Sequence, residues 1–301
     1  LLEKADFDAP RDPADPVAHS RGAGQSLEEA TAGVVRRFGF QLSPAALQGL
    51  ASDVHVFLHA PLGGVLEGAC LADVPRARRI DELEFLLPVP EHLSREGLVA
   101  AFRAGPPPGE GTSWAQAPGA WEAWLDEVGR LSFATFHGFL TGFVDLVFAT
   151  EEDKARVHLL DYKTNKLHQR EMSAQAAAAS YDQPALVRAM IESRYVLQYH
   201  LYQVALLRLL RSRHGASFDW DQHVGGAWYP FLRGVQDVSA APVKGSALRR
   251  GIFYDRAPRE RIEALDALFG SPGSSVTARR RARMGVPSTT PHTHQLSGGL
   301  P

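Results

Sequence analysis

Apolar and polar residues alternate along short stretches of the chain, as expected of strands that bury one face. Around residue 83, for example, Glu82 and Glu84 alternate with Leu83 and Phe85. Two apolar, β-branched stretches flank the polar run 151–154, which predicts a hairpin. Strands are predicted at 80–89, 140–150, 157–163, 226–232 and 252–254.

Helix signals occupy most of the remaining sequence. Ser26 precedes Glu29 by three residues, and Ser43 is followed by Pro44, both of which are typical of helix starts. Gly215 follows a long helical pattern where a helix end is expected. Helices are predicted at 26–38, 43–58, 121–128, 182–193, 195–213 and 258–268, whereas 1–25 and 105–109 are rich in Pro, Gly or Asp and predict loops.

The composition limits the class of protein. Of the 301 residues, 45% are apolar and 22% are charged, which is typical of a globular domain. No apolar run approaches the roughly 20 residues that span a bilayer, so no membrane partner is expected. The single cysteine, Cys70, excludes internal disulfides and a Cys-rich zinc site. The net charge is -2, so nucleic-acid binding would need a local basic patch.

The predicted hairpin carries the candidate chemistry. Asp145 lies in the middle of its first strand, and Asp161 and Lys163 lie on one face of its second strand. The turn brings the two aspartates together, and buried neighbouring carboxylates repel unless a positive charge lies between them. Mg²⁺ prefers such oxygen ligands, and a lysine beside it can stabilise charge on a phosphoryl group. Metal-assisted phosphodiester hydrolysis fits this pattern, although Asp161 and Lys163 could equally form a structural ion pair.

The same residues resemble a known family. The sequences Gly-Phe-Val-Asp at 142–145 and Leu-Leu-Asp-Tyr-Lys-Thr-Asn at 159–165 resemble those of RecB-type nuclease domains, which are PD-(D/E)xK nucleases. The resemblance covers most of residues 1–270 and includes the segments 82–88, 194–202 and 223–234. It implies an α/β fold with a central mixed β-sheet flanked by helices, of the restriction-endonuclease type.

The resemblance also implies a domain division and an incomplete metal site. Residues 1–270 would form the nuclease domain, with a helical entry at 1–79 and a catalytic core at about 80–270, followed by a tail or linker at 271–301. A metal-binding histidine of the family would fall two residues before Leu1. Since the chain begins at Leu1 rather than Met, we expect it to be a fragment of a longer protein. Because that histidine would be absent, we expect the metal affinity of the fragment to be reduced.

Roles follow at the matching positions. Asp145 and Asp161 would bind the metal together with the backbone carbonyl of Tyr162, and Lys163 would be catalytic. Because Gln198 and Tyr202 are four residues apart, they share one helix face. In the family that face lies beside the active site.

Alternatives remain for the supporting residues. Tyr202 could simply pack in the core while Gln198 is solvated. Glu84 could also face the site, or be an exposed strand residue.

The implied activity is that of a Mg²⁺-dependent exodeoxyribonuclease of the exonuclease V type, with Mn²⁺ as a substitute and Ca²⁺ as an inhibitory ion. It implies DNA as substrate and a RecBCD-type helicase–nuclease acting in double-strand break repair and recombination in the bacterial cytoplasm. The implied partners are an upstream helicase region of the same polypeptide, RecC-like and RecD-like subunits, and a RecA-type recombinase. This chain itself contains no phosphate-binding motor loop.

Two rival interpretations remain. The domain could be a nuclease-like scaffold that docks partner subunits or a recombinase and is inactive as an isolated fragment. It could instead be an unrelated α/β binding protein with structural hairpin charges, which predicts that Asp145 and Asp161 point apart.

Overall fold

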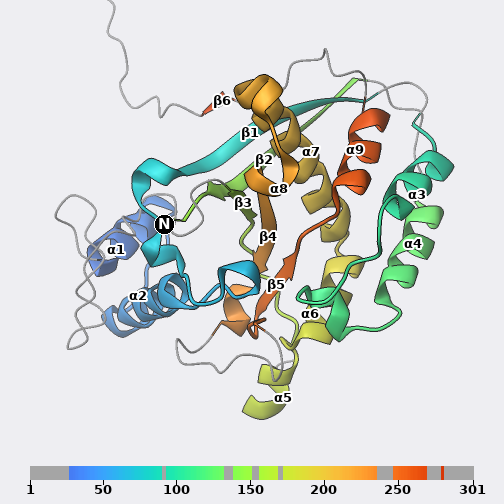
Figure 1. Ribbon diagram of the computed structural model, residues 1–301. Coiled ribbons are helices and arrows are strands. Elements are labelled where there is room, and N and C mark those ends of the chain that lie inside the picture. Colours follow the sequence, from blue (N-terminus) through green and yellow to red (C-terminus); the bar gives the residue numbers. More distant parts are fainter. Residues whose placement is uncertain are drawn as a thin grey trace, which may run out of the picture.

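A computed structural model describes residues 27–89, 93–131, 138–150, 156–168, 172–235, 247–269 and 279–280 (Figure 1). The predicted entry loop at 1–25 and the hairpin turn at 151–154 lie outside these residues. No helix in the described ranges is long and apolar enough to cross a membrane.

One mixed β-sheet forms the centre of the molecule, with strand order β5-β4-β3-β2-β1-β6. β3 and β4 are parallel, and the other neighbours are antiparallel. The strands are β1 (Arg79–Val89), β2 (Gly138–Phe148), β3 (Val157–Leu160), β4 (Val224–Pro230), β5 (Ile252–Asp255) and β6 (Arg279–Arg280).

Some of the helices begin where the sequence offers a capping side chain. Ser43 accepts a hydrogen bond from the Ala46 N–H, and Asp182 accepts one from the Ala185 N–H. The helices are α1 (Leu27–Arg37), α2 (Pro44–His59), α3 (Arg95–Arg103), α4 (Ala120–Arg130), α5 (Ala174–Ala179), α6 (Gln183–Glu192), α7 (Tyr195–His214), α8 (Trp220–His223) and α9 (Arg259–Leu268).

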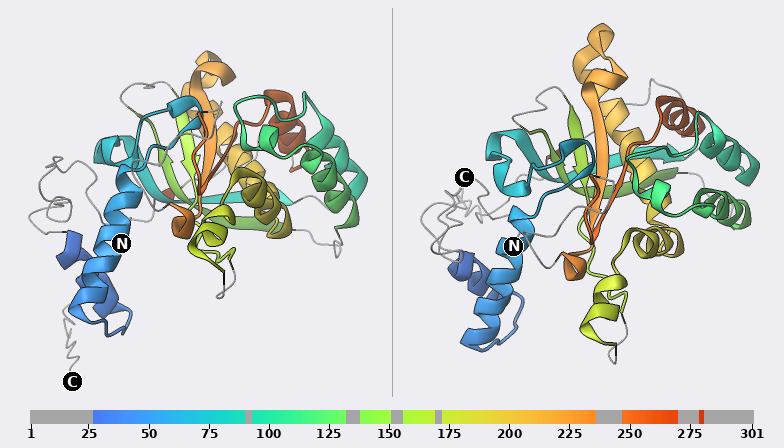
Figure 2. Two further views of the ribbon diagram at one scale, coloured as in Figure 1. Left: turned by 90° about the horizontal axis from the view of Figure 1, so that it is seen from below. Right: turned by 60° about the horizontal axis from the view of Figure 1, so that its bottom comes forward.

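Two apolar clusters cover the sheet. The larger joins residues of β1 to β5 to α3, α4, α6, α7 and α9. The smaller joins alternate residues of β2 to β5 to the end of α2 and the loops that follow it. Figures 1 and 2 show α1 and α2 together at one end of the molecule and α3, α4 and α9 at the other. The α/β fold with a central mixed sheet is confirmed.

Several elements differ from the sequence prediction, including the short helices α5 and α8, which were not predicted. β3 ends at Leu160 rather than at residue 163, because the chain separates from β2 there. The helix α3 was not predicted; it starts at Ser94, whose side chain accepts the Gly97 N–H. Within the predicted tail, β6 pairs with β1 at Leu83 and Glu84.

A glycine in β2 makes room for an aromatic contact that supports the candidate site. Gly142 lies opposite Phe85, and a Cβ at Gly142 would lie 2.6 Å from the Phe85 ring. The Phe85 ring in turn packs edge-on against Tyr202 of α7, with ring centroids 5.4 Å apart. Because a side chain at position 142 would displace Phe85, the glycine sets the distance between the sheet and α7.

We therefore expect Gly142→Ala to lower the free energy of unfolding by about 1–3 kcal/mol through overpacking. The matched control is Gly49→Ala in α2, where nothing lies within 4 Å of the added Cβ. That change should raise stability by about 0.5–1 kcal/mol, since glycine weakens a helix interior. Urea unfolding measures both, and equal effects of the two substitutions would contradict this role of Gly142.

Candidate active site

The site lies where β2 and β3 separate. Their pairing runs from Phe148–His158 to Leu146–Leu160 and ends there, so that Asp145 and Asp161 are the next residues on the two strands. Beyond this point residues 138–144 pair with β1, while 161–163 remain bonded to β4. We call this separation, with Asp145 on one side and Asp161 on the other, the fork.

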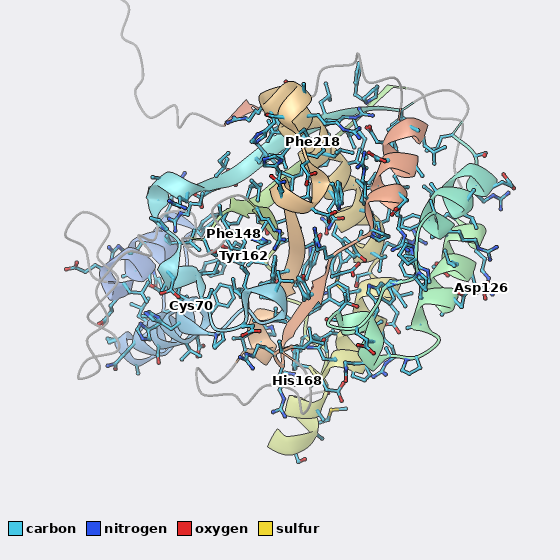
Figure 3. All side chains as sticks on the ribbon, viewed as in Figure 1. Cys70, Asp126, Phe148, Tyr162, His168 and Phe218 are labelled. Carbon is cyan, nitrogen blue, oxygen red and sulfur yellow. The ribbon has the colours of Figure 1, made fainter. Side chains whose placement is uncertain are left out.

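Backbone hydrogen bonds hold the β3 side of the fork. The Asp161 N–H donates to the Trp228 carbonyl at 3.1 Å, and the Lys163 N–H donates to the Pro230 carbonyl at 2.9 Å. The Tyr162 ring points to the other side of the sheet and packs edge-on against Phe57 of α2, at a centroid distance of 5.6 Å. Figure 3 labels Tyr162, which lies near the middle of the molecule.

The regular alternation of strand residues is interrupted on the β2 side. Val144 and Val147 belong to the larger apolar cluster, but Leu146 belongs to the smaller one. Across from Asp145, Glu82 of β1 has φ 53°, a conformation that non-glycine residues rarely adopt. The alternation of side chains between the two faces of the sheet is therefore interrupted in both β1 and β2 beside the fork.

The three predicted catalytic side chains meet at the fork. The Tyr162 N–H donates to Oδ2 of Asp145 at 2.9 Å. The carboxyl groups of Asp145 and Asp161 are hydrogen-bonded to each other. Nζ of Lys163 lies 2.6 Å from Oδ1 of Asp161, and both of these side chains are buried. The alternative in which the two aspartates point apart is wrong for this geometry.

The predicted helix residues join the same group. The Lys163 ammonium donates to Oε1 of Gln198 at 3.0 Å, and Nε2 of Gln198 donates to the Tyr202 hydroxyl at 2.8 Å. That hydroxyl also lies near Asp161, whose negative charge raises the pKa of Tyr202. Gln198 is therefore more than a solvated surface residue, and Tyr202 both packs against Phe85 and contacts the acidic pair.

Two tyrosines complete the surroundings of Lys163 and were not singled out from the sequence. The ammonium lies 3.9 Å from the ring centroid of Tyr195 and 5.0 Å from that of Tyr229. The Tyr195 hydroxyl donates to Oδ1 of Asn165 at 3.1 Å, and the Tyr229 hydroxyl donates to Gln198 at 3.3 Å. These contacts fix the lysine between aromatic faces, which attract cations.

Glu84 is placed differently from the other candidates. It lies opposite Phe143, and in the described part of the chain it makes no hydrogen bond or ion pair to Asp145, Asp161 or Lys163. The glutamate in register with Asp145 is Glu82. The sequence could not show that Glu82 rather than Glu84 lies across from Asp145. A glutamate in a strand pattern gives no sign that its φ is positive.

Burial dominates the electrostatics of the site. It raises the pKa of Asp145 from 3.8 to about 7, together with the negative charge of Asp161, while the Tyr162 N–H and Lys163 act in the opposite direction. Burial also raises the pKa of Asp161, against the stabilising charge of Lys163. The pKa of the Tyr202 hydroxyl is raised by burial and by the nearby aspartates, so it stays protonated and can donate.

The donor set fits a hard divalent cation. Asp145 and Asp161 adjoin, and the raised pKa of Asp145 keeps a proton on it to about pH 7. A cation could take the place of that proton and neutralise the charge of the two carboxylates. The Tyr162 backbone carbonyl can add a neutral oxygen ligand. Over the described ranges, no group of three or more His, Cys, Asp or Glu side chains could hold a metal.

Comparison with known proteins identifies the family. Residues 79–276 match the PD-(D/E)XK nuclease superfamily, which is about two thirds of the chain and includes all of the residues at the fork. The chain belongs to the PD-(D/E)XK nuclease superfamily. Members of this superfamily typically use divalent metal ions.

Curated relatives narrow the comparison to the RecB nuclease domain. The chain is 34% identical over 220 residues to the RecBCD enzyme subunit RecB of Escherichia coli K12, which covers 73% of this chain and 16% of that protein. It is 30% identical over 234 residues to RecB of Haemophilus influenzae, which covers 77% of this chain and 16% of that protein. RecB of Mycolicibacterium smegmatis is 31% identical over 209 residues, which covers 69% of this chain and 19% of that protein. The PD-(D/E)XK chain thus resembles the RecB nuclease domain and spans less than a fifth of these RecB proteins.

Asp145→Asn should stabilise the metal-free protein at pH 8 and much less at pH 4. Below about pH 4 the aspartate is protonated in both the folded and unfolded states. Between about pH 4 and 7 the unfolded chain loses the proton first, so the cost of burying the charge grows as the pH rises. Asparagine removes that cost and keeps an oxygen for the Tyr162 N–H.

Thermal unfolding in EDTA at the two pH values measures this effect. Asp126→Asn, on the exposed surface of α4, is the matched control and should change little at either pH. An equal gain at pH 4 and pH 8 would contradict the raised pKa of Asp145.

Tyr195→Leu should lower the nuclease rate by about 10-fold or more, because a desolvated cation–π contact contributes about 2 kcal/mol. Tyr195→Phe should retain most of the rate, since it keeps the ring over Lys163 and loses only the hydrogen bond to Asn165. Steady-state cleavage assays should show the loss in kcat rather than in KM. Equal losses in both variants would assign the effect to the hydrogen bond instead.

Proposed function

We propose that this domain hydrolyses DNA phosphodiester bonds with Mg²⁺. The observation that supports this function is the meeting of Asp145, Asp161 and Lys163 at the fork, with Lys163 held against Asp161. Asp145, Asp161 and the Tyr162 carbonyl would hold the ion, with Mn²⁺ as a substitute and Ca²⁺ as an inhibitory ligand. A bound Mg²⁺ would polarise the phosphodiester and neutralise the negative charge that develops on it.

The protein's own groups orient the reaction. Lys163 can donate a hydrogen bond to the attacking water or to a phosphoryl oxygen, where charge develops in the transition state. Gln198 and Tyr195 hold its ammonium at a fixed position, so little reorganisation is needed when substrate arrives. The Tyr202 hydroxyl lies near Asp161 and is held by Gln198, so it can donate to the carboxylate.

The similarity to RecB supports a wider role. We infer an exodeoxyribonuclease of the exonuclease V type within a RecBCD-type helicase–nuclease, acting in double-strand break repair and recombination in bacterial cytoplasm. The partners would be DNA, a helicase region of the same polypeptide, and RecC-like and RecD-like subunits. A RecA-type recombinase would be a further partner.

Asp161→Asn should lower Mg²⁺-dependent DNA degradation by roughly 100-fold or more, the loss typical when a group that stabilises transition-state charge is removed. The substitution keeps the side-chain volume but leaves the buried Lys163 ammonium without its partner, so the melting temperature should fall and is measured to show that the variant still folds. Asp126→Asn serves as the exposed control and should retain full activity. Undiminished degradation by Asp161→Asn would overturn the proposed function.

The inactive-scaffold alternative predicts a different result. Calorimetric titration with Mg²⁺ or Mn²⁺ should show saturable uptake that is lost in Asp161→Asn. A pure scaffold would show no specific uptake in either protein.

A further inference from the structure

A packing contact joins the fork to the helix α2, which lies outside the residues that match the superfamily. Phe57, in the last turn of α2, is 4% exposed, and its ring packs edge-on against that of Tyr162. Tyr162 lies between Asp161 and Lys163 in the chain, but its ring packs against the smaller apolar cluster on the opposite face of the sheet. The contact therefore connects α2 to the residue that has a catalytic candidate on either side.

The Tyr162 backbone faces the β2 side of the fork. The N–H groups of Asp161 and Lys163 are bonded to β4, whereas the Tyr162 N–H donates to Oδ2 of Asp145 at 2.9 Å. In an extended strand the N–H and C=O of one residue point toward the same neighbouring strand, so the Tyr162 carbonyl also faces the Asp145 side. The pairing of β2 with β3 ends at Leu160, so strand pairing does not fix this peptide against β2.

We propose that Phe57 is a positioning residue for metal binding. Its ring holds the Tyr162 ring, and thereby holds the peptide that bonds Asp145 and offers its carbonyl to the ion. The inference rests on the proposed function, in which that carbonyl is a metal ligand. If the Phe57 ring were absent, the Tyr162 side chain would lose a packing neighbour and the chain could twist at the fork. The Tyr162 N–H and carbonyl would then move together, away from Asp145 and the ion.

The simpler interpretation is that Phe57 only fills the core. Leu58 provides the comparison, because it is 1% exposed, lies in the same turn of α2 and belongs to the same smaller cluster, but has no ring to pack against Tyr162. A core role predicts that substitutions at Phe57 and Leu58 lower stability and leave metal binding alone. A positioning role predicts that only the substitution at Phe57 also weakens metal binding.

Calorimetric titration of the 301-residue chain with Mn²⁺ separates the two roles. Phe57→Leu should raise the dissociation constant for Mn²⁺ by about 10-fold, the lower end of the loss typical for residues that orient metal ligands. Leu58→Val is the matched control and should leave that constant unchanged. Both variants lose buried apolar volume, so both should melt at a lower temperature.

Cleavage assays give a second measurement. Phe57→Leu should need about 10-fold more Mg²⁺ for half of its maximal rate, in proportion to its weaker metal binding. At saturating Mg²⁺ its kcat should stay near that of the unaltered chain, because Asp145, Asp161 and Lys163 are all present. Phe57→Met, which has a flexible side chain without a ring, takes the place of Phe57→Leu if melting shows that the latter does not fold.

A double-mutant cycle tests whether Phe57 acts through Tyr162. Tyr162→Leu removes the other ring of the contact and should also weaken Mn²⁺ binding. In that background Phe57→Leu should weaken it no further, because residues that act through one contact are not additive.

The results that would overturn the inference differ from those that would overturn the proposed function. An unchanged dissociation constant in Phe57→Leu contradicts the positioning role, as does an equal rise in Leu58→Val. Additive losses in the cycle contradict it as well, since Phe57 would then act by another route. If the unaltered chain shows no saturable uptake of Mn²⁺, the proposed function itself is contradicted, and this inference with it.

Discussion

The structure of the site depends on one electrostatic constraint: two carboxyl groups are buried in contact at the end of a strand pair, with a single ammonium beside them. Isolated buried charges cost several kcal/mol, and neighbouring like charges add to that cost. In the metal-free protein Asp145 meets this cost by keeping its proton to about pH 7, and Asp161 by its ion pair with Lys163. A cation that replaces the proton would relieve the remaining repulsion.

The groups around Lys163 meet this constraint. The ammonium that offsets the negative pair is itself fixed by an amide and two aromatic rings, from Gln198, Tyr195 and Tyr229. Because Gly142 has no side chain, the Phe85 ring can pack over it and contact Tyr202. The apolar packing between β2 and α7 therefore sets the position of the charged groups.

The sequence predicted those parts of the site that depend on local pattern. Period-two alternation and the spacing of Asp145, Asp161 and Lys163 located the hairpin, and the resemblance to a known family added Gln198 and Tyr202. The role of Tyr195 could not be predicted, because its contact with Lys163 joins residues 32 positions apart, from different elements. The irregular backbone at Glu82 was hidden for another reason, since glutamate carries no signal for positive φ.

The parallel pairing of β3 with β4 has a consequence for how the protein becomes active. Parallel neighbours need a long crossover, and here it includes α6 and α7, so Asp161 and the residues that anchor it on β4 are far apart in sequence. Such long-range contacts form late, because loop closure must be completed before they contribute stability. A nascent chain that has not yet reached Val224 lacks the strand that holds Asp161 and Lys163. The candidate site is therefore complete only in a chain that includes β4.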